Sequence, residues 1–275
     1  MNKNIAFIGA GVMAGAILRS ACQSVAPGQF WIADKVQEKA EALAAELGCT
    51  TAVSNLEAAQ AADYIFLCVK PQMASDVLQE IAPPLRESLD AGQPKVLCSI
   101  LAGVTIDTMR ACLDSPPQPV VRIMPNTPAL VGAGFLLITA DETVTEAQSQ
   151  TILDLLAPCG KLQWLDEKLF DTATALTGSS PAFYYMFIDA MADAGVQAGL
   201  PREQAIVFAA QAALGSAAMV LETGSHPGIL KDMVCSPGGS TIAGVSALEA
   251  GGFRQAVMSA VAATCARNKE LGEMV

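Results

Sequence analysis

The chain has a single histidine, His226, among its 275 residues, and none of its cysteines form a C-x-x-C pair. Zinc centres use clustered histidine and cysteine ligands, and a Ser/His nucleophilic pair needs a histidine beside the nucleophile. His226 precedes Pro227 and is expected to be a turn residue. The sequence therefore argues against a metal centre and against hydrolase-type nucleophilic catalysis.

Positive charge is also scarce, with 16 lysines and arginines against 27 acidic residues, a net charge of −11 and no basic cluster. Nucleic acids and anionic membrane surfaces need concentrated positive charge, so we expect neither as a partner. Apolar residues make up 52% of the chain, yet no uninterrupted, strongly apolar run reaches the roughly eighteen residues of a membrane span. No charged-then-apolar leader precedes the first expected strand. Eight scattered cysteines indicate reduced thiols, and we expect a cytoplasmic protein.

The first motif is a glycine turn after a short apolar run. Residues 5–8 lead into Gly-x-Gly-x-x-Ala over residues 9–14, and an apolar-periodic segment follows, which is the strand–turn–helix context of a dinucleotide site. Gly9 allows the tight turn, and Gly11 allows a pyrophosphate to approach a helix N-terminus. Asp34 follows the next expected strand at the spacing of a ribose-binding carboxylate. The competing interpretation is that Asp34 caps the following helix.

The first 165 residues alternate between strand and helix patterns. The expected strands are 5–8, 30–33, 51–53, 64–69, 96–100, 120–124, 134–139 and 161–165, and the expected helices include 35–47, a brief one capped by Asn55, 73–81 and 145–156. This order predicts a doubly wound α/β domain over residues 1–165, with ligands beyond the C-terminal ends of the strands. The candidate cofactor-binding residues are Gly9, Ala10, Gly11, Val12, Met13, Asp34, Lys35, Asn55, Val69, Lys70, Pro71, Ala102, Gly103 and Asn126.

Strand signals stop after residue 165, and residues 166–275 are expected to form a separate helical domain. Helices are expected at 166–175, 181–198, 202–221, 227–234, 240–249 and 253–271. The segment 206–221 carries no charge and is apolar on every side, so it must be buried on every side. A second copy of the chain would supply that burial, and we therefore predict an obligate homo-oligomer.

The turn Ser236-Pro237-Gly238-Gly239-Ser240-Thr241 separates two of these helices. Such a break leaves backbone N–H groups free at the start of the next helix, where an anion can accept hydrogen bonds from them. It predicts a site for a small carboxylate beside the Thr241 hydroxyl. The alternative is an ordinary connection between two helices.

Together these motifs resemble the pyrroline-5-carboxylate reductase family over essentially the whole chain. Besides the opening glycine turn, the resemblance is carried by residues 69–72 (VKPQ), 102–104 (AGV), 126–128 (NTP), 178–182 (GSSPA), 230–241 (LKDMVCSPGGST) and 248–254 (LEAGGFR). The run over residues 230–241 is highly specific, whereas the glycine turn is shared by many unrelated dehydrogenases.

The resemblance implies a Rossmann-type N-terminal domain and an all-α C-terminal dimerisation domain, with a homodimer and larger rings such as a decamer. It implies reduction of 1-pyrroline-5-carboxylate to L-proline by NADPH or NADH, the last step of proline biosynthesis. By position, Ser236, Gly238, Gly239 and Ser240 would hold the substrate carboxylate. Thr241 would be the catalytic residue, hydrogen-bonded to the ring nitrogen.

The chain departs from the family pattern at three positions. Ser180 and Phe183 stand where family members usually have glycine and tyrosine, and we expect activity to survive because the carboxylate turn is intact. Asp34 stands where many members accept the 2′-phosphate of NADPH, and its charge would repel that phosphate. Lys35 and Asn55 would partly offset this repulsion, so we expect NADH to be used at least as well as NADPH.

Two alternatives stay open at this point. The first is another NAD(P)-dependent imine or β-hydroxyacid reductase; the latter type uses a lysine of the C-terminal domain as acid and base, for which Lys231 is the nearest candidate. The second is a catalytically silent dinucleotide-binding regulator, which would be expected to have a damaged carboxylate turn.

Overall fold

The computed structural model describes residues 3–113 and 118–272, which form two compact units. One unit, here called the sheet unit, comprises residues up to 179 together with those from 264 onward. The other, here called the helical unit, comprises residues 180–263. Each is described on its own.

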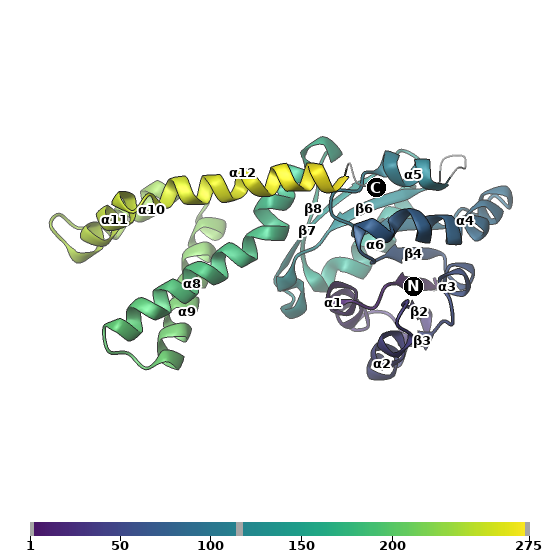
Figure 1. Ribbon diagram of the computed structural model, residues 1–275, viewed down its shortest axis with the longest axis horizontal. Helices are drawn as coiled ribbons and strands as arrows, with labels where there is room; N and C mark the ends of the chain where they lie inside the picture. Colours follow the sequence, from purple (N-terminus) through teal and green to yellow (C-terminus); the bar gives the residue numbers. More distant parts are fainter. Residues whose placement is uncertain (1–2, 114–117, 273–275) are drawn as a thin grey trace. The chain divides into compact units, whose positions relative to one another are not determined.

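The sheet unit is built on one eight-stranded sheet with the order β3-β2-β1-β4-β5-β6-β7-β8 (Figure 1). Neighbouring strands are parallel except for the antiparallel pair β6 and β7. The strands are β1 Ile5–Ile8, β2 Phe30–Ala33, β3 Thr50–Thr51, β4 Tyr64–Leu67, β5 Val96–Ser99, β6 Val120–Met124, β7 Gly134–Ala140 and β8 Gly160–Trp164. All eight predicted strands are present, with small shifts at their ends, and the α/β class is confirmed.

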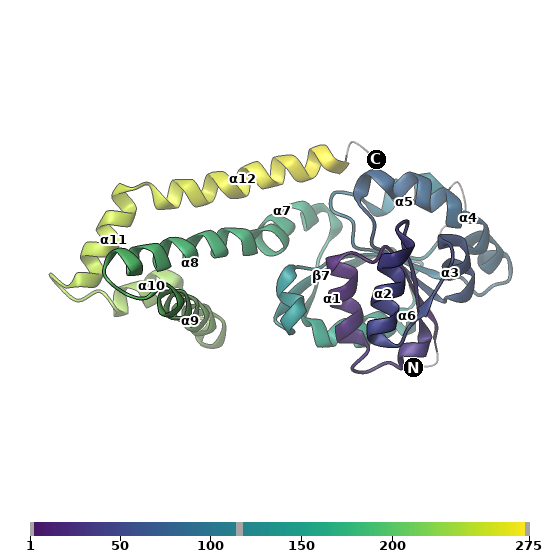
Figure 2. The ribbon, with the colours of Figure 1, turned by 60° about the horizontal axis from the view of Figure 1, so that its bottom comes forward.

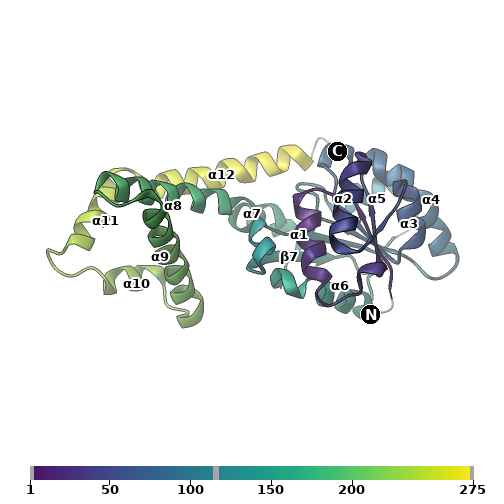
Figure 3. The ribbon, with the colours of Figure 1, turned by 90° about the horizontal axis from the view of Figure 1, so that it is seen from below.

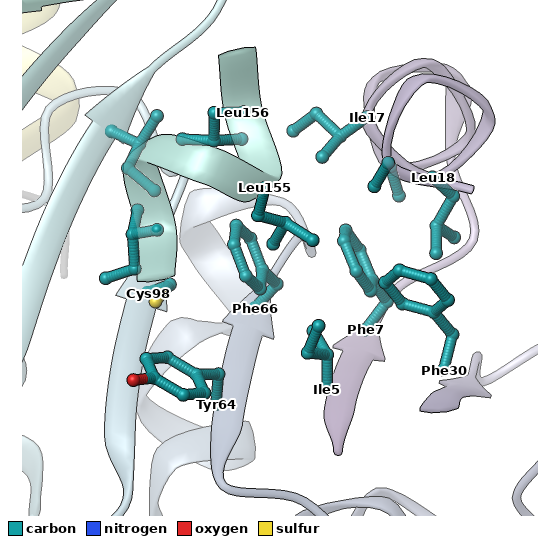
Figure 4. Close-up of a cluster of buried hydrophobic side chains, with 14 of the residues drawn as sticks. Ile5, Phe7, Ile17, Leu18, Phe30, Tyr64, Phe66, Cys98, Leu155 and Leu156 are labelled. Carbon is teal, nitrogen blue, oxygen red and sulfur yellow. The ribbon is translucent and has the colours of Figure 1, made fainter. Parts of the chain in front are cut away.

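Helices cover both faces of this sheet, which explains why the central strands β1, β2 and β4 are apolar along their whole length. One face packs against α1 (Val12–Ala21), α2 (Gln37–Leu47) and α6 (Glu146–Leu156), as Figure 2 shows. In that layer Phe7 and Phe66 stack with ring centroids 4.7 Å apart, below Leu155 of α6 (Figure 4). The opposite face packs against α3 (Asn55–Ala61), α4 (Ala74–Asp90) and α5 (Ile106–Leu113).

Three expectations for this layer are wrong. Helix α4 continues to Asp90 instead of ending at residue 81, and it passes through Pro83 and Pro84 because buried residues on both sides of this pair pack against the sheet. Helix α5 was not predicted. The cap of α3 is Ser54, whose hydroxyl accepts the Glu57 N–H at 3.1 Å, so Asn55 is the first helical residue and not the cap.

The two units divide later in the chain than the expected boundary after residue 165. Helix α7 (Phe170–Thr174) belongs to the sheet unit, where Phe170 is fully buried. It continues through a π-helical turn, Ala175–Ser179, straight into α8 (Ser180–Gln197). The last turns of α12 (Phe253–Gly272) also belong to the sheet unit, because Asn268 Nδ2 donates to the Asp171 carbonyl at 3.1 Å.

The helical unit contains α8, α9 (Arg202–Thr223), α10 (Pro227–Met233), α11 (Ser240–Ala250) and the first part of α12. Its main internal contact is between α8 and α9 (Figure 3). Large apolar side chains are left exposed within one chain, among them Met186 at 73% and Leu214 at 65%. The unit therefore buries little of its own apolar surface.

Helix α9 is the one helix among the described residues that is long and apolar enough to cross a membrane, by length and composition only. Only 11% of its apolar window is buried within the chain. A single helix of this kind is weak evidence for a span, because a helix buried in a protein interface passes the same test. It contains the segment for which the sequence predicts burial by another copy.

A capping box starts α6, and its loss provides a test of the fold. The Thr145 hydroxyl accepts the Gln148 N–H at 3.3 Å, while Gln148 Oε1 accepts the Thr145 N–H at 2.9 Å. Thr145→Ala removes the cap and should lower the free energy of unfolding by about 1 kcal/mol. Urea denaturation at fixed protein concentration measures this change. Ser149→Ala, within the same helix, serves as a control that should lose no stability.

Candidate active site

The glycine turn after β1 requires glycine for two reasons. Gly9 has φ +106°, and a Cβ at this position would lie 2.6 Å from the Cys68 carbonyl oxygen. The Gly9 N–H donates to the Ala33 carbonyl at 2.7 Å, which holds the turn against the end of β2. The tight turn inferred from the sequence is therefore present.

The N-terminus of α1 is open to a ligand. Gly11 is the N-cap residue, no side chain among the described residues caps the helix, and apart from the adjoining residues none of them places an atom within 4 Å of where a Gly11 Cβ would be. The first amides of the helix, at Val12 and Met13, point along the axis toward this space, and Val12 is exposed. An uncapped N-terminus of a helix of this length fits a phosphate or pyrophosphate.

Asp34 is bound to the backbone through both of its carboxylate oxygens. Oδ2 accepts the Ala10 N–H at 2.7 Å, and Oδ1 accepts the Val36 N–H at 2.8 Å. Asp34 therefore joins the glycine turn to the end of β2. It does not cap α2 in the usual way, because the N-cap residue of α2 is Val36 and no side-chain hydrogen bond caps the helix. A fixed negative charge therefore lies at the edge of the glycine turn.

Most of the remaining cofactor candidates follow β4, β5 and β6, so the parallel sheet brings their loops to the same edge as the glycine turn. Of the others, Lys35 follows β2 directly after Asp34, and Asn55 is the first residue of α3. Strand order reverses beside β1, which has β2 on one side and β4 on the other, and dinucleotides bind at such a switch point. Lys70 is exposed and precedes Pro71, while Gly103 has φ +77° after β5. The edge as a whole fits a dinucleotide.

Two candidates have partners within the chain. The Asn126 side chain is buried; its Nδ2 donates to the Thr177 carbonyl at 2.9 Å and its Oδ1 accepts the Phe135 N–H at 3.0 Å. The Asn55 amide donates to Glu80 Oε2 at 2.7 Å. Both side chains therefore hold the loops around them, and direct contact with a cofactor remains a prediction for each.

The proposed carboxylate turn lies in the helical unit, immediately before α11. Gly238 has φ +68°, Gly239 is the N-cap, and no side chain caps α11. The Gly239 N–H donates to the Ser236 carbonyl at 3.0 Å, and the Ser236 hydroxyl lies where a Gly239 Cβ would be, so a side chain at residue 239 would displace this hydroxyl. The first amides of an eleven-residue helix, including that of Thr241, are thus presented beside a hydroxyl group.

Other titratable groups near this turn are poor acid–base candidates. The hydrogen bond from Lys231 to Asp232 raises the pKa of the Lys231 ammonium, which keeps it protonated. His226 Nδ1 accepts the Gly228 N–H at 3.0 Å and caps α10, in agreement with its predicted place in a turn.

In the sheet unit, burial raises the pKa of the Cys68 thiol beside the glycine turn, so this cysteine stays a neutral thiol. No group of three potential metal ligands gathers within residues 3–113 and 118–272.

The sequence interpretation missed one buried charge in the sheet unit. Arg122 lies on β6 and is 1% exposed, and it pairs with Glu167 and Asp171. The available signal was an arginine inside the otherwise apolar strand, which requires a buried counter-charge.

The glycine turn, the fixed carboxylate and the strand order define the sheet unit as the dinucleotide-binding part of an NAD(P)H-dependent oxidoreductase. Residues 4–103 match the family model described as "NADP oxidoreductase coenzyme F420-dependent". Residues 167–271 match the model described as "Pyrroline-5-carboxylate reductase dimerisation".

Relatives of known name agree over the full length. The chain is 44% identical over 275 residues to pyrroline-5-carboxylate reductase of Escherichia coli (strain K12), covering 99% of this chain and 100% of the relative. It is 39% identical to that of Pisum sativum, covering 97% and 95%. The structure of pyrroline carboxylate reductase from Plasmodium falciparum with NADP bound superposes with a TM-score of 0.87 at 32% identity, covering 98% of each chain. The chain belongs to the pyrroline-5-carboxylate reductase family.

Removing the charge of Asp34 tests its effect on cofactor choice. Asp34→Asn keeps one acceptor oxygen for the turn and removes the repulsion of a 2′-phosphate. The ratio of kcat/KM for NADPH to that for NADH should rise about tenfold, which corresponds to about 1.4 kcal/mol. Glu38→Gln, in the first turn of α2, is the matched control and should leave the ratio unchanged. An unchanged ratio in Asp34→Asn would remove Asp34 from cofactor discrimination.

Proposed function

We propose that the protein reduces the C=N bond of 1-pyrroline-5-carboxylate to give L-proline, with NADH or NADPH as the hydride donor. The observation that carries the proposal is the intact turn of residues 236–241 before the uncapped N-terminus of α11, in a chain of this family. The test is consumption of NADH and NADPH with 1-pyrroline-5-carboxylate, compared with 3-hydroxy acids in the oxidative direction.

The substrate carboxylate would be held by peptide dipoles. The amides of Ser240 and Thr241 and the Ser236 hydroxyl would supply donors at a helix N-terminus, where an anion is stabilised, while the Gly239 N–H is engaged by the Ser236 carbonyl. No side chain competes for these donors, and glycine at residues 238 and 239 keeps the approach open. Such binding fixes the position of the ring without adding a charged side chain to the site.

The Thr241 hydroxyl would hydrogen-bond the ring nitrogen. A protonated cyclic imine is already electrophilic, so a strong protein acid is not needed at the carbon that is reduced. Thr241 then orients the nitrogen and its proton, and orientation of the reactants supplies several kcal/mol of barrier reduction in favourable cases, about 7 or more in well-oriented model systems. The reaction adds one hydride to carbon and leaves the proton on nitrogen, giving the secondary amine of proline.

The bound dinucleotide supplies the hydride, and the sheet unit has groups that would hold it. The open N-terminus of α1 fits the pyrophosphate, and Asp34 lies where the adenosine ribose is expected. The loops at residues 69–71 and 102–103 would line the rest of the cofactor. Because Asp34 is a fixed negative charge at the edge of the turn, NADH is used at least as well as NADPH.

The alternatives are less well supported. A β-hydroxyacid reductase needs a lysine that exchanges a proton near neutral pH, and Asp232 raises the pKa of Lys231 away from that range. A silent regulator would be expected to have a damaged carboxylate turn, and the turn of residues 236–241 is intact. The imine reductase activity is therefore favoured.

The helical unit would pair two copies of the chain, and such dimers would assemble into a larger ring such as a decamer. The support is the match to a dimerisation model and the exposed apolar residues of α8 and α9. Burial of α9 between copies explains its composition without a membrane, and the net charge of −11 opposes binding to nucleic acid. The cysteines described by the structure are all free thiols, which fits a reducing cytoplasmic location.

Thr241→Ala tests the proposed role of the hydroxyl. Loss of the hydrogen bond to the ring nitrogen should lower kcat by about tenfold to a hundredfold, at the low end of what a positioned proton-handling group contributes. The melting temperature should not change, because Thr241 is exposed and caps no helix. Thr241→Ser keeps the hydroxyl and should retain most activity. Wild-type steady-state kinetics in Thr241→Ala would exclude Thr241 from the mechanism.

A charge placed on α9 tests the assembly. Leu214 is 65% exposed within one chain, and Leu214→Glu would carry an unpaired carboxylate into an apolar interface. Light scattering should then show loss of the oligomer at concentrations where the wild type is fully assembled, together with loss of activity. Gln23→Glu, on the surface of the sheet unit, adds the same charge and should leave assembly intact. A Leu214→Glu protein that assembles normally would contradict the proposed interface.

A further inference from the structure

A charged cluster in the sheet unit ties together segments that are far apart in the sequence. The Arg122 side chain, on β6, is 1% exposed; Nη1 lies 3.2 Å from Glu167 Oε1 and Nη2 lies 3.2 Å from Asp171 Oδ1. Its guanidinium also lies over the Phe170 ring, 4.7 Å from the centroid. A buried arginine pairs with acids at fixed positions because its planar fork allows few geometries.

The loop after β5 is connected to this cluster. Glu167 Oε1, which pairs with Arg122, also accepts the Ile106 N–H at 2.9 Å, at the start of α5. Ala102 packs in the apolar cluster built around Phe170, the ring that lies under the Arg122 guanidinium. Two separate contacts therefore run from Arg122 to the segment 102–106.

The other side of this loop rests on the end of α12. Gly103 has φ +77°, and a Cβ there would lie 2.9 Å from both the Asn268 carbonyl oxygen and the Gly272 nitrogen. Asn268 is buried, and its amide donates to the Asp171 carbonyl at 3.1 Å. Asp171 thus contacts both Arg122 and the helix that supports Gly103.

We propose that Arg122 is a positioning residue for the dinucleotide, because through Glu167 and Asp171 it fixes the 102–106 loop at the edge of the sheet. This loop follows a parallel strand on the switch-point side, where the cofactor is bound in the proposed function, and the inference rests on that function. Neither Arg122 nor its two acids contact the cofactor themselves. Their effect is to set how closely the Ala102 and Gly103 backbone can approach it.

A second arginine–carboxylate pair in the sheet unit lies away from the cofactor loops. Arg110 of α5 pairs with Asp141 at 3.1 Å, and Asp141 Oδ2 also accepts the Val120 N–H at 2.7 Å, where β6 begins. Parallel strands begin at the edge opposite to the cofactor loops, so this pair does not support them. Arg110→Met is therefore a matched control for the loss of a partly buried ion pair.

The test measures binding of NADH and of NADPH to the full-length protein by fluorescence titration, in the absence of 1-pyrroline-5-carboxylate. Glu167→Gln keeps an acceptor for the Ile106 N–H but weakens the pair with Arg122. Its dissociation constants for both cofactors should rise by about 2- to 30-fold, the range that such coupled networks produce. The KM for 1-pyrroline-5-carboxylate at saturating cofactor should stay within about twofold of the wild type, since the carboxylate turn is in the other unit.

Further variants separate positioning from stability. Arg110→Met should lower the melting temperature without changing cofactor dissociation constants. Arg122→Lys keeps the charge but cannot pair with both acids as the fork does, so it should weaken cofactor binding while folding. Arg122→Met would leave two acids without their partner and is used only if it folds, so Glu167→Gln and Arg122→Lys decide the outcome.

Unchanged cofactor dissociation constants in folded Glu167→Gln and Arg122→Lys would overturn the inference, as would an equal weakening in Arg110→Met. The proposed function fails separately. If the wild type binds dinucleotide but does not reduce 1-pyrroline-5-carboxylate, the activity is wrong while the positioning role can still be measured. If the wild type binds neither dinucleotide, both proposals fail.

Discussion

The free amides at the start of two helices are the interaction on which both proposed binding sites depend. The N-cap residue is Gly11 for α1 and Gly239 for α11, and neither offers a side chain to satisfy the first N–H groups. Some other helices have a side-chain cap, as Thr145 caps α6 and Ser54 caps α3, whereas α2, α4 and α9 also lack one. With glycine as the N-cap residue, leaving each N-terminus without a side-chain cap costs roughly a few tenths of a kcal/mol in the absence of a ligand. A bound anion, a pyrophosphate at one and a carboxylate at the other, would recover it.

Around the proposed dinucleotide site, two glycines allow backbone segments to come into close contact. Gly9 and Gly103 both have positive φ, and at both a Cβ would collide with backbone atoms of another segment. Asp34 and Asn126 then hold neighbouring loops through paired hydrogen bonds to the main chain. The dinucleotide edge is thus shaped mainly by backbone contacts, and the residues that matter most are those that fix the backbone.

Much of the fold could be predicted because the central strands β1, β2 and β4 are short apolar runs, and buried parallel strands have this pattern. The predicted end of α4 at residue 81 is wrong because Pro83 and Pro84 normally end a helix, and here packing against the sheet outweighs that preference. The predicted division after residue 165 differs from the observed one because only tertiary contacts show that Phe170 and Asn268 belong to the sheet unit. In the candidate site, both glycine turns could be predicted from the glycine residues of their own segments. The partners of Asp34, Asn126 and Arg122 come from residues distant in sequence and could not be assigned from it.

The poor internal burial of the helical unit has a consequence for how the protein acquires its stability. A helix such as α9, apolar all round and largely uncovered in one chain, cannot gain its burial energy before a second chain arrives. Folding of this unit and association of the chains would then be one reaction, with a midpoint of denaturation that rises with protein concentration. Dilution would act on such a protein as a denaturant does, and freshly made chains would have to meet before aggregation through the same apolar surface removes them.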